Sequence, residues 1–403
     1  MSYIMKILLF LIKIVTSKVF VIGFFECIMR IILILNELII IYKTLLKVLV
    51  MLKNFFHYLG SVGQDLKFLL VLIVTISSMT ATSVLANEVN IYSARKGYLM
   101  QPLVDAFQNQ TDIKVNVISG KAKVLQKRIK QEGRNTRADV LLTVDAGNLF
   151  NAKKDGLLRR INSSKLNYLI PGYLRDDEGY WYGLSIRSRV IMYNPEKVKP
   201  SELSTYEDLA SEKWNKRICI RSSSNIYNQS LLASIISHNG EIEAEKWAKN
   251  VKNNFSKDPK GNDRTQMTSV VLGECDITVA NTYYLGKWIA SEKDNERKYA
   301  EKISVFFPNQ ADRGAHINIS GAAVMKHSKN YKNAITFLEF LASDEAQKLY
   351  AKANHEYPIR DNIPVSDIVN SWGFPFKKDT LNLDELGINN SKAVMIFDRI
   401  GWK

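Results

Sequence analysis

The hydrophobic and polar positions of residues 87–403 follow two alternating patterns. Short apolar runs at 89–92, 114–118 and 139–142 have the length of buried strands, and each precedes a segment with one apolar helical face, at 99–107, 124–129 and 148–154. The patterns predict further strands at 180–193, 217–220, 276–280 and 314–325. They predict further helices near 206–210, after Asn225, after residue 264, at 335–341 and at 344–353. Repeated strand–helix units of this size indicate an α/β fold with mostly parallel strands, whose ligands bind at the carboxyl ends of the strands.

The first 86 residues have a different pattern, with long apolar runs at 4–25 and 31–50 broken by scattered lysines. A shorter apolar run at 66–79 is followed by small residues and by Val84-Leu-Ala86, the arrangement of a secretory signal peptide. We expect residues 51–86 to be this signal peptide, starting at Met51 and cleaved after Ala86. Residues 1–50 are then a hydrophobic extension from a mis-assigned start, or alternatively transmembrane helices, because residues 31–50 approach the roughly 20 needed for a span.

Charge and cysteine content refine this picture of an exported protein. Residues 87–403 contain 47 Lys and Arg against 37 Asp and Glu, a net charge of +10. Export argues against a nucleic-acid partner, whereas an anionic ligand or a membrane surface fits the positive charge. Cys219 and Cys275 remain after cleavage, and an oxidising compartment favours a disulfide between them, although two buried free thiols are the alternative.

The candidate chemistry centres on the adjacent tyrosines Tyr283 and Tyr284, which follow the predicted strand at 276–280. Phenolate is a hard anionic oxygen ligand that suits a small trivalent cation. A free phenol has a pKa near 10, so only a strongly polarising ion such as Fe³⁺ makes it a ligand at neutral pH. Amphipathic packing at a strand end is the structural alternative. The segment 221–229 offers hydroxyls and helix-start amides to an anion, or is simply an Asn-capped helix start.

Further segments extend this pattern across residues 87–403. They are Asn90-Ile-Tyr-Ser-Ala-Arg95, Ala138-Asp-Val140, Ser185-Ile-Arg187-Ser-Arg189-Val, Ser222-Ser-Ser-Asn225-Ile-Tyr227-Asn-Gln229, Asn281-Thr-Tyr-Tyr284 and Ser320-Gly-Ala-Ala323. Together they resemble the ferric-ion-binding periplasmic subunits of ABC transporters, also called bacterial transferrins. The resemblance implies a two-lobed type 2 periplasmic binding protein with a two-strand hinge and a ligand cleft between the lobes. It implies lobe 1 at 87–187 with 312–360, and lobe 2 at 188–311 with 361–403.

The resemblance also implies a ligand set. Tyr283 and Tyr284 match the paired metal ligands of the family, and Tyr227 matches a third tyrosine of one subgroup. Arg95 and Arg187 match positions that hold a synergistic carbonate in that subgroup. Three phenolates neutralise Fe³⁺, and two guanidiniums offset the two charges of carbonate.

The sequence departs from the family after the first strand. Lys96 and Gly97 stand where many relatives have His, and Thr143-Val144 stands where others have Glu. A metal ligand from lobe 1 is therefore doubtful, although Tyr98 is a possible substitute that more simply packs within its helix.

The resulting expectation is a monomeric periplasmic protein that binds Fe³⁺ or a ferric chelate and delivers it to an inner-membrane ABC permease. The alternative is a receptor for an oxyanion or small organic anion that uses Arg95 and Arg187 without metal. An enzyme is not expected, because the sequence contains no nucleophile motif of the G-x-S-x-G type and its histidines are scattered.

Overall fold

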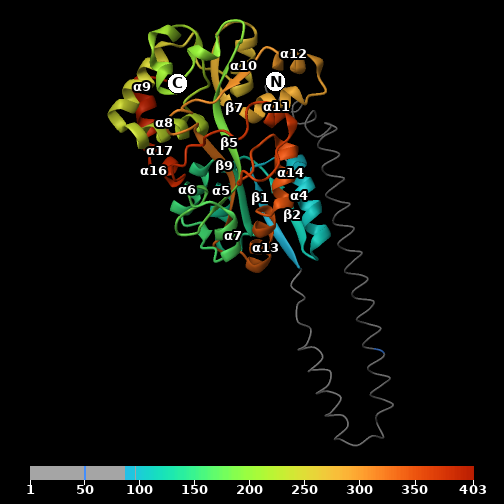
Figure 1. The fold of residues 1–403 in the computed structure, drawn as a ribbon. Helices are drawn as coiled ribbons and strands as arrows, with labels where there is room; N and C mark the ends of the chain where they lie inside the picture. The colour runs from blue at the N-terminus through green and yellow to red at the C-terminus, as the bar shows by residue number, and fades with distance from the viewer. Residues whose placement is uncertain (1–49, 51–86, 96) are drawn as a thin grey trace, which may run out of the picture. The chain divides into compact units, whose positions relative to one another are not determined.

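The computed structural model describes residue 50, residues 87–95 and residues 97–403, and labels follow Figure 1. The predicted extension and signal peptide therefore fall outside the described residues, apart from residue 50. Residues Ala86–Lys403 form one compact unit. No helix in the part that is described combines the length and the apolar content of a membrane span.

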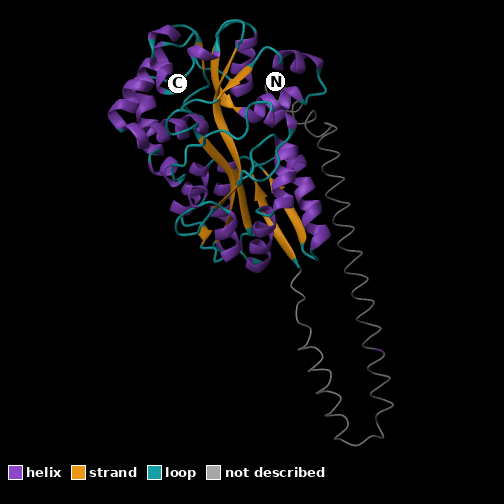
Figure 2. Ribbon diagram, viewed as in Figure 1, coloured by secondary structure: helices purple, strands orange, loops and turns teal. Residues whose placement is uncertain are grey.

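The unit consists of two lobes, and the first is built on a mixed sheet. Its strands are β1 (Glu88–Ser93), β2 (Lys114–Ser119), β3 (Val140–Val144), β4 (Leu158–Arg159), β5 (Tyr182–Tyr193) and β9 (Ile317–Met325). They lie in the order β2-β1-β3-β9-β5, with β4 also paired to β9. The helices are α4 (Gly97–Gln110), α5 (Ala122–Glu132), α6 (Ala146–Lys154), α7 (Ser164–Leu169), α13 (Tyr331–Leu341) and α14 (Asp344–Asn354). Helices flank the strands on both sides (Figure 2).

The second lobe adds three strands to the far half of β5. These are β6 (Ile218–Cys219), β7 (Ile277–Asn281) and β8 (Ser304–Phe306), with β5 pairing to β7 and β8, and β7 pairing to β6. The helices of this half and of the C-terminal segment are α8 (Ile226–Asn239), α9 (Glu241–Asn253), α10 (Asp263–Val271), α11 (Thr282–Ile289), α12 (Asp294–Ala300), α15 (Asp367–Asn370), α16 (Asp384–Ile388) and α17 (Asn390–Ile400).

Strand β5 connects the two lobes. Its first half pairs antiparallel with β9, and its second half, from Arg189 onward, pairs antiparallel with β7. It runs through the middle of the described unit from one sheet to the other (Figure 1). All twelve of its residues are buried, because the strand is covered on both faces.

The prediction of mostly parallel strands is wrong. Parallel pairing is confined to β1 with β2 and β3, and to β6 with β7. The strands β4, β5, β8 and β9 all pair antiparallel with their neighbours. Near 206–210 the expected helix is a short 3₁₀ segment, Glu207–Ala210.

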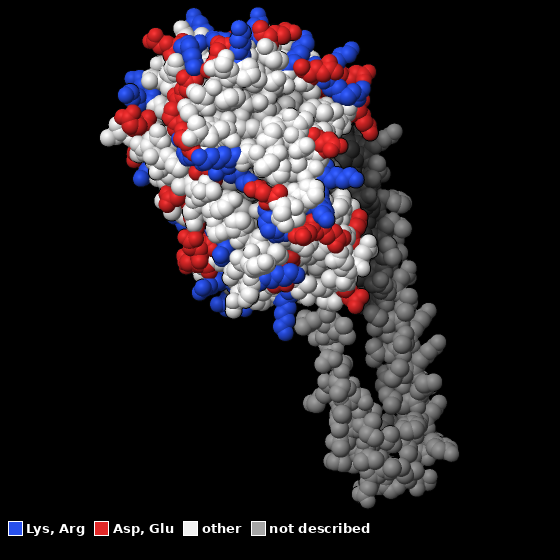
Figure 3. Space-filling model, viewed as in Figure 1, with Lys and Arg blue, Asp and Glu red and all other residues white. Residues whose placement is uncertain are grey.

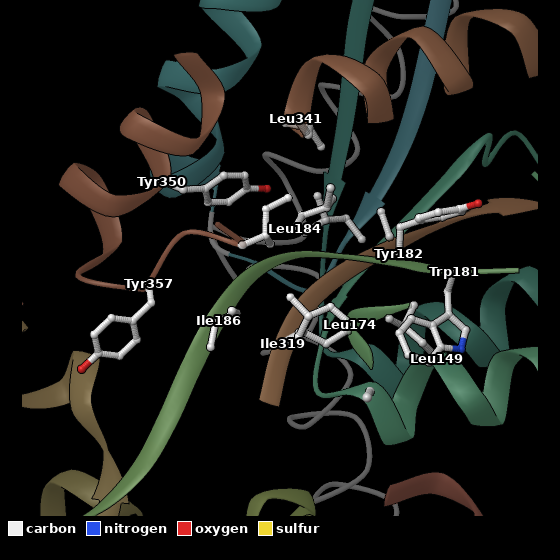
Figure 4. Close-up of a cluster of buried hydrophobic side chains, with 14 of the residues drawn as sticks. Leu149, Leu174, Trp181, Tyr182, Leu184, Ile186, Ile319, Leu341, Tyr350 and Tyr357 are labelled. Carbon is white, nitrogen blue, oxygen red and sulfur yellow. The ribbon is translucent and has the colours of Figure 1, made fainter. Parts of the chain in front are cut away.

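Apolar side chains from both lobes are buried in two clusters. Figure 4 shows part of the first, where Trp181, Leu184 and Ile186 of the β5 region pack with Ile319 of β9 and Leu149 of α6. The second cluster belongs to lobe 2 and includes Trp214, Trp247 and Trp402. On the face shown in Figure 3, acidic and basic side chains are interspersed, so the positive charge is not gathered into one patch there.

Candidate metal centre

All five predicted site residues line one cavity of about 430 Å³. Its lining residues are Ala94, Arg95, Leu99, Val144, Arg187, Tyr227, Arg264, Tyr283, Tyr284, Lys287 and Glu356. Arg187 lies on β5, the strand shared by both lobes, while the tyrosines come from α8 and α11 of the second lobe. The cavity therefore lies at the junction of the two sheets.

The local structure of two helix starts brings the tyrosines together. Asn225 caps α8 by accepting a hydrogen bond from the Tyr227 amide at 2.9 Å, which confirms the capping interpretation of this segment. Helix α11 begins directly after β7, so Tyr283 and Tyr284 occupy its first turn rather than the strand end. The hydroxyl of Tyr283 lies 3.5 Å from that of Tyr227, and the Tyr283 and Tyr284 rings are 4.3 Å apart.

Burial favours the protonated form of the Tyr283 and Tyr284 phenols. It raises the pKa of Tyr283 well above its usual value, and Tyr227 and Tyr284 raise it further. Burial, with a further contribution from Tyr227, raises the pKa of Tyr284 to about 12. A strong Lewis acid is therefore needed to displace these protons, and phenolate oxygens favour a hard, highly charged cation.

The two arginines differ in what they contact. Arg187 donates from Nη2 to the Ile319 carbonyl, and its guanidinium lies 5.3 Å from the centre of the Tyr227 ring. Its Nε and Nη1 are buried and have no hydrogen-bond partner within residues 87–95 and 97–403. We call these two nitrogens the open donors of Arg187. A buried guanidinium with open donors is suited to receive an oxyanion.

Arg95, in contrast, is held by Glu356. Its Nη2 and Nη1 donate to the two carboxylate oxygens at 2.6 and 3.1 Å. Burial alone would raise the pKa of Glu356, but the Arg95 guanidinium lowers it overall, so the pair is ionised. Arg95 lies at the predicted place, but its charge is already compensated.

A second buried network, of ion pairs and hydrogen bonds, holds the start of α8, which carries Tyr227. Asp263 forms ion pairs with Arg189 at 3.0 Å and with Arg221 at 2.6 Å. Arg189 also donates to Asn228 at 2.6 Å, and the Arg221 guanidinium lies 5.6 Å from the Tyr227 ring centre. This network fixes the start of α8 against α10, and with it the position of the tyrosine.

The sequence interpretation did not identify three charged residues of the cavity wall, namely Glu356, Arg264 and Lys287. Arg264 and Lys287 could have been noticed, because one starts α10 and the other lies one helical turn after Tyr283. Glu356 follows α14 and belongs to no motif. The suggested substitute ligand Tyr98 has a side chain outside the described part, so its contribution stays a prediction.

Three known proteins, or their solved structures, are similar to this chain. The chain is 48% identical over 316 residues to iron uptake protein A1 of Synechocystis, covering 78% of this chain and 88% of the relative. It is 30% identical to the major ferric iron-binding protein of Neisseria meningitidis, covering 71% of this chain and 85% of that protein. Its fold matches a solved Trichodesmium protein (IdiA, FutA) in complex with iron and citrate, with a TM-score of 0.77, 49% identity, and coverage of 78% and 100%.

A profile of one protein family matches residues 135–373, which is more than half of the chain. The matched region contains β5, both tyrosine-bearing helices and Glu356. The chain therefore belongs to the bacterial extracellular solute-binding protein family.

Proposed function

We propose that this chain is the periplasmic solute-binding component of an iron ABC transporter. Tyr227, Tyr283 and Tyr284 bind Fe³⁺ as phenolates, and a synergistic carbonate completes the coordination at the open donors of Arg187, beside Arg95. The protein acts as a monomer, closes its two lobes over the ion, and delivers it to the inner-membrane permease. The names of its relatives, which include ferric iron-binding and periplasmic proteins, support this proposal.

The observation that carries the proposal is the meeting of three tyrosines and a buried guanidinium in one cavity. Three phenolates cancel the charge of Fe³⁺, and the guanidinium then favours an anion as the remaining ligand. In this proposal, residues 51–86 are removed after Ala86, and the mature lobes comprise 87–187 with 312–360 and 188–311 with 361–403.

A second candidate function is a metal-free receptor for an oxyanion or small organic anion. The open donors of Arg187 favour it, because they can bind an anion without any metal. In that case the tyrosines form only the wall of the cavity.

Visible absorption distinguishes the two functions. The purified protein is stripped of metal and titrated with ferric citrate, with and without bicarbonate. Tyrosinate bound to Fe³⁺ gives a broad charge-transfer band, which we expect to strengthen with bicarbonate and to disappear in a Tyr283→Phe/Tyr284→Phe double variant. Tyr168→Phe is the control, because Tyr168 is 88% exposed and remote from the cavity lining. If folded wild-type protein gives no band, the tyrosines only pack in the cavity wall, and titration of metal-free protein with anions then tests the second function.

A further inference from the structure

A buried ion pair in the cavity wall joins two residues that are 261 positions apart in the chain. Arg95 and Glu356 have side chains only 3% and 5% exposed, and both carboxylate oxygens accept from the guanidinium. Ser185 also donates to Glu356, and Ser320 does so at 3.4 Å. The Glu356 carboxylate therefore accepts hydrogen bonds from Arg95, Ser185 and Ser320, and its charge is balanced by Arg95.

The backbone around Glu356 is fixed by the hinge strand. The next residue, Tyr357, exchanges two backbone hydrogen bonds with Ile186 of β5, at 2.7 and 2.8 Å. On its other side, Arg95 lies 5.4 Å from the centre of the Tyr350 ring. The pair is thus built into the rigid wall of the cavity, where breaking a buried ion pair by moving one partner is costly.

The surroundings of Arg187 differ from those of Arg95. It forms no ion pair with any residue of the described ranges, although Tyr227, Tyr283, Glu356 and Asp145 lie close enough to influence it. Glu356 forms its ion pair with Arg95 and acts on Arg187 only from a distance. The two guanidiniums predicted to hold the anion therefore differ, because Arg95 is compensated by an ion pair and Arg187 is not. Arg264, which pairs with Glu296 at 3.8 Å, and Lys287 line the same cavity.

We propose that Glu356 sets the charge of the synergistic anion. Because its carboxylate compensates Arg95, the site favours a monoanion, such as bicarbonate or a single carboxylate group, over doubly charged carbonate. This inference rests on the proposed ferric-binding function and refines its anion. Arg95, neutralised by Glu356, lies beside the anion as a hydrogen-bond donor, and Arg187 supplies the positive charge that attracts the anion.

The test compares two probe anions of the same shape and different charge. Oxalate carries two carboxylates, and oxamate replaces one of them with a neutral amide. Protein is loaded with iron from ferrous chloride oxidised in CO₂-free air, and each anion is titrated while the charge-transfer band is followed. In Glu356→Gln, which keeps the size of the side chain, we expect the ratio of oxalate to oxamate affinity to rise at least about tenfold over wild type.

Two further variants show whether the charge of the pair is responsible. Arg95→Met/Glu356→Met removes both charges together. Its ratio of oxalate to oxamate affinity should therefore stay within about threefold of the wild-type ratio, even if both affinities change. Glu207→Gln is the matched control, because Glu207 pairs with Arg313 at 2.7 Å outside the cavity, and its ratio should not change. An unchanged ratio in Glu356→Gln, or a raised ratio in the double variant, would overturn the proposal.

Failure of the proposed function is distinguishable from failure of this inference. If wild-type protein gives no iron band, ferric binding fails, and the same two anions are titrated calorimetrically into metal-free protein. The change of ratio in Glu356→Gln is expected there too, because the charge pair exists without iron. A ratio that is the same in wild type and variant then contradicts the role of Glu356.

Discussion

At the scale of single residues, Arg187 shows how a binding site differs from a stabilised core. A buried guanidinium normally has its donors satisfied, because desolvating them without partners costs free energy. The open donors of Arg187 bear this cost at two nitrogens, whereas Glu356 satisfies both terminal nitrogens of Arg95 and leaves only its Nε without a partner in the described residues. In the proposed function, an anion that satisfies the open donors recovers this free energy, which links anion binding to iron retention.

This leads to a prediction for Arg187→Lys. Lysine keeps the positive charge but lacks the planar fork that binds an oxyanion through two donors. We expect the affinity for Fe³⁺ to fall by about 10- to 100-fold and its dependence on bicarbonate to disappear, because a hydrogen bond to a charged group contributes about 1.5–3 kcal/mol. The charge-transfer band should persist, since the tyrosines remain. Titration with ferric citrate in both conditions measures this, with the exposed Arg137→Lys as control. Full bicarbonate dependence in Arg187→Lys would contradict it.

Most residues of the candidate site could be predicted from the sequence, because they belong to short motifs. The Tyr283-Tyr284 pair, Tyr227 and Arg187 were each singled out, and all of them line one cavity. Glu356 was missed for a physical reason. Its partner Arg95 is distant in sequence, and the two meet through tertiary contacts such as the pairing of Tyr357 with Ile186. A contact made by tertiary packing leaves no local signal.

At the scale of elements, hydrophobic periodicity located most strands but not their directions. The run at 180–193 was correctly expected to be β-rich, yet nothing in its pattern showed that one strand joins both sheets. A strand buried on both faces has a continuous apolar run whether its neighbours are parallel or antiparallel. The direction of β5 and β9 depends on long connections, so it could not be predicted from the pattern.

The disulfide between Cys219 and Cys275 was one of two alternatives, and the structure confirms it. It ties the end of β6 to the residues just before β7, in the strand pair from which α11 and its tyrosines continue. The chain between the cysteines spans α8, α9 and α10, so the crosslink removes much freedom from the unfolded chain.

We therefore predict that Cys219→Ala/Cys275→Ala lowers the free energy of unfolding by about 4 kcal/mol in the chain-entropy description. Both cysteines are almost fully buried, so alanine avoids placing new polar groups in the core. Urea unfolding of the purified protein measures the change. Wild type with added reductant is the comparison, and it should approach the variant once the bond is reduced. A midpoint equal to that of oxidised wild type would show that the crosslink does not limit stability.

At the scale of the whole molecule, the lobes are joined by more than the shared strand. Helix α16, from the C-terminal segment, packs on α6 of the first lobe and on α8 of the second, and α8 carries Tyr227 at its start. Ser230 of α8 also donates to Asp145 at the start of α6, at 2.8 Å. A hinge motion that opens the cleft must therefore rearrange these contacts as well as bend β5.

The contact of α16 with the first lobe contains an unusual group of carboxyls. Asp384, the first residue of α16, lies beside Asp176, while Lys153 of α6 pairs with Asp176 at 2.5 Å and with Glu178 at 2.8 Å. Burial, with a further contribution from Asp176, raises the pKa of Asp384 to about 7, although Lys153 acts in the opposite direction. Asp384 is thus a carboxyl that takes up a proton near neutral pH in the folded protein.

This pKa gives the stability of the molecule a pH dependence of defined sign. An unfolded aspartate titrates near pH 3.9, so between about pH 4 and 7 the folded state binds the proton more tightly and stability falls as pH rises. Asp384→Asn removes this loss, so the variant should be more stable than wild type at pH 8. After allowance for solvent screening of a partly buried group, the gain of the variant over wild type in free energy of unfolding should be about 1 kcal/mol larger at pH 8 than at pH 5. Urea unfolding at the two pH values measures this, with the exposed Asp112→Asn as control. An equal advantage at both pH values would mean that Asp384 does not titrate between them, and that the contact of α16 with the first lobe keeps the same charge throughout this range.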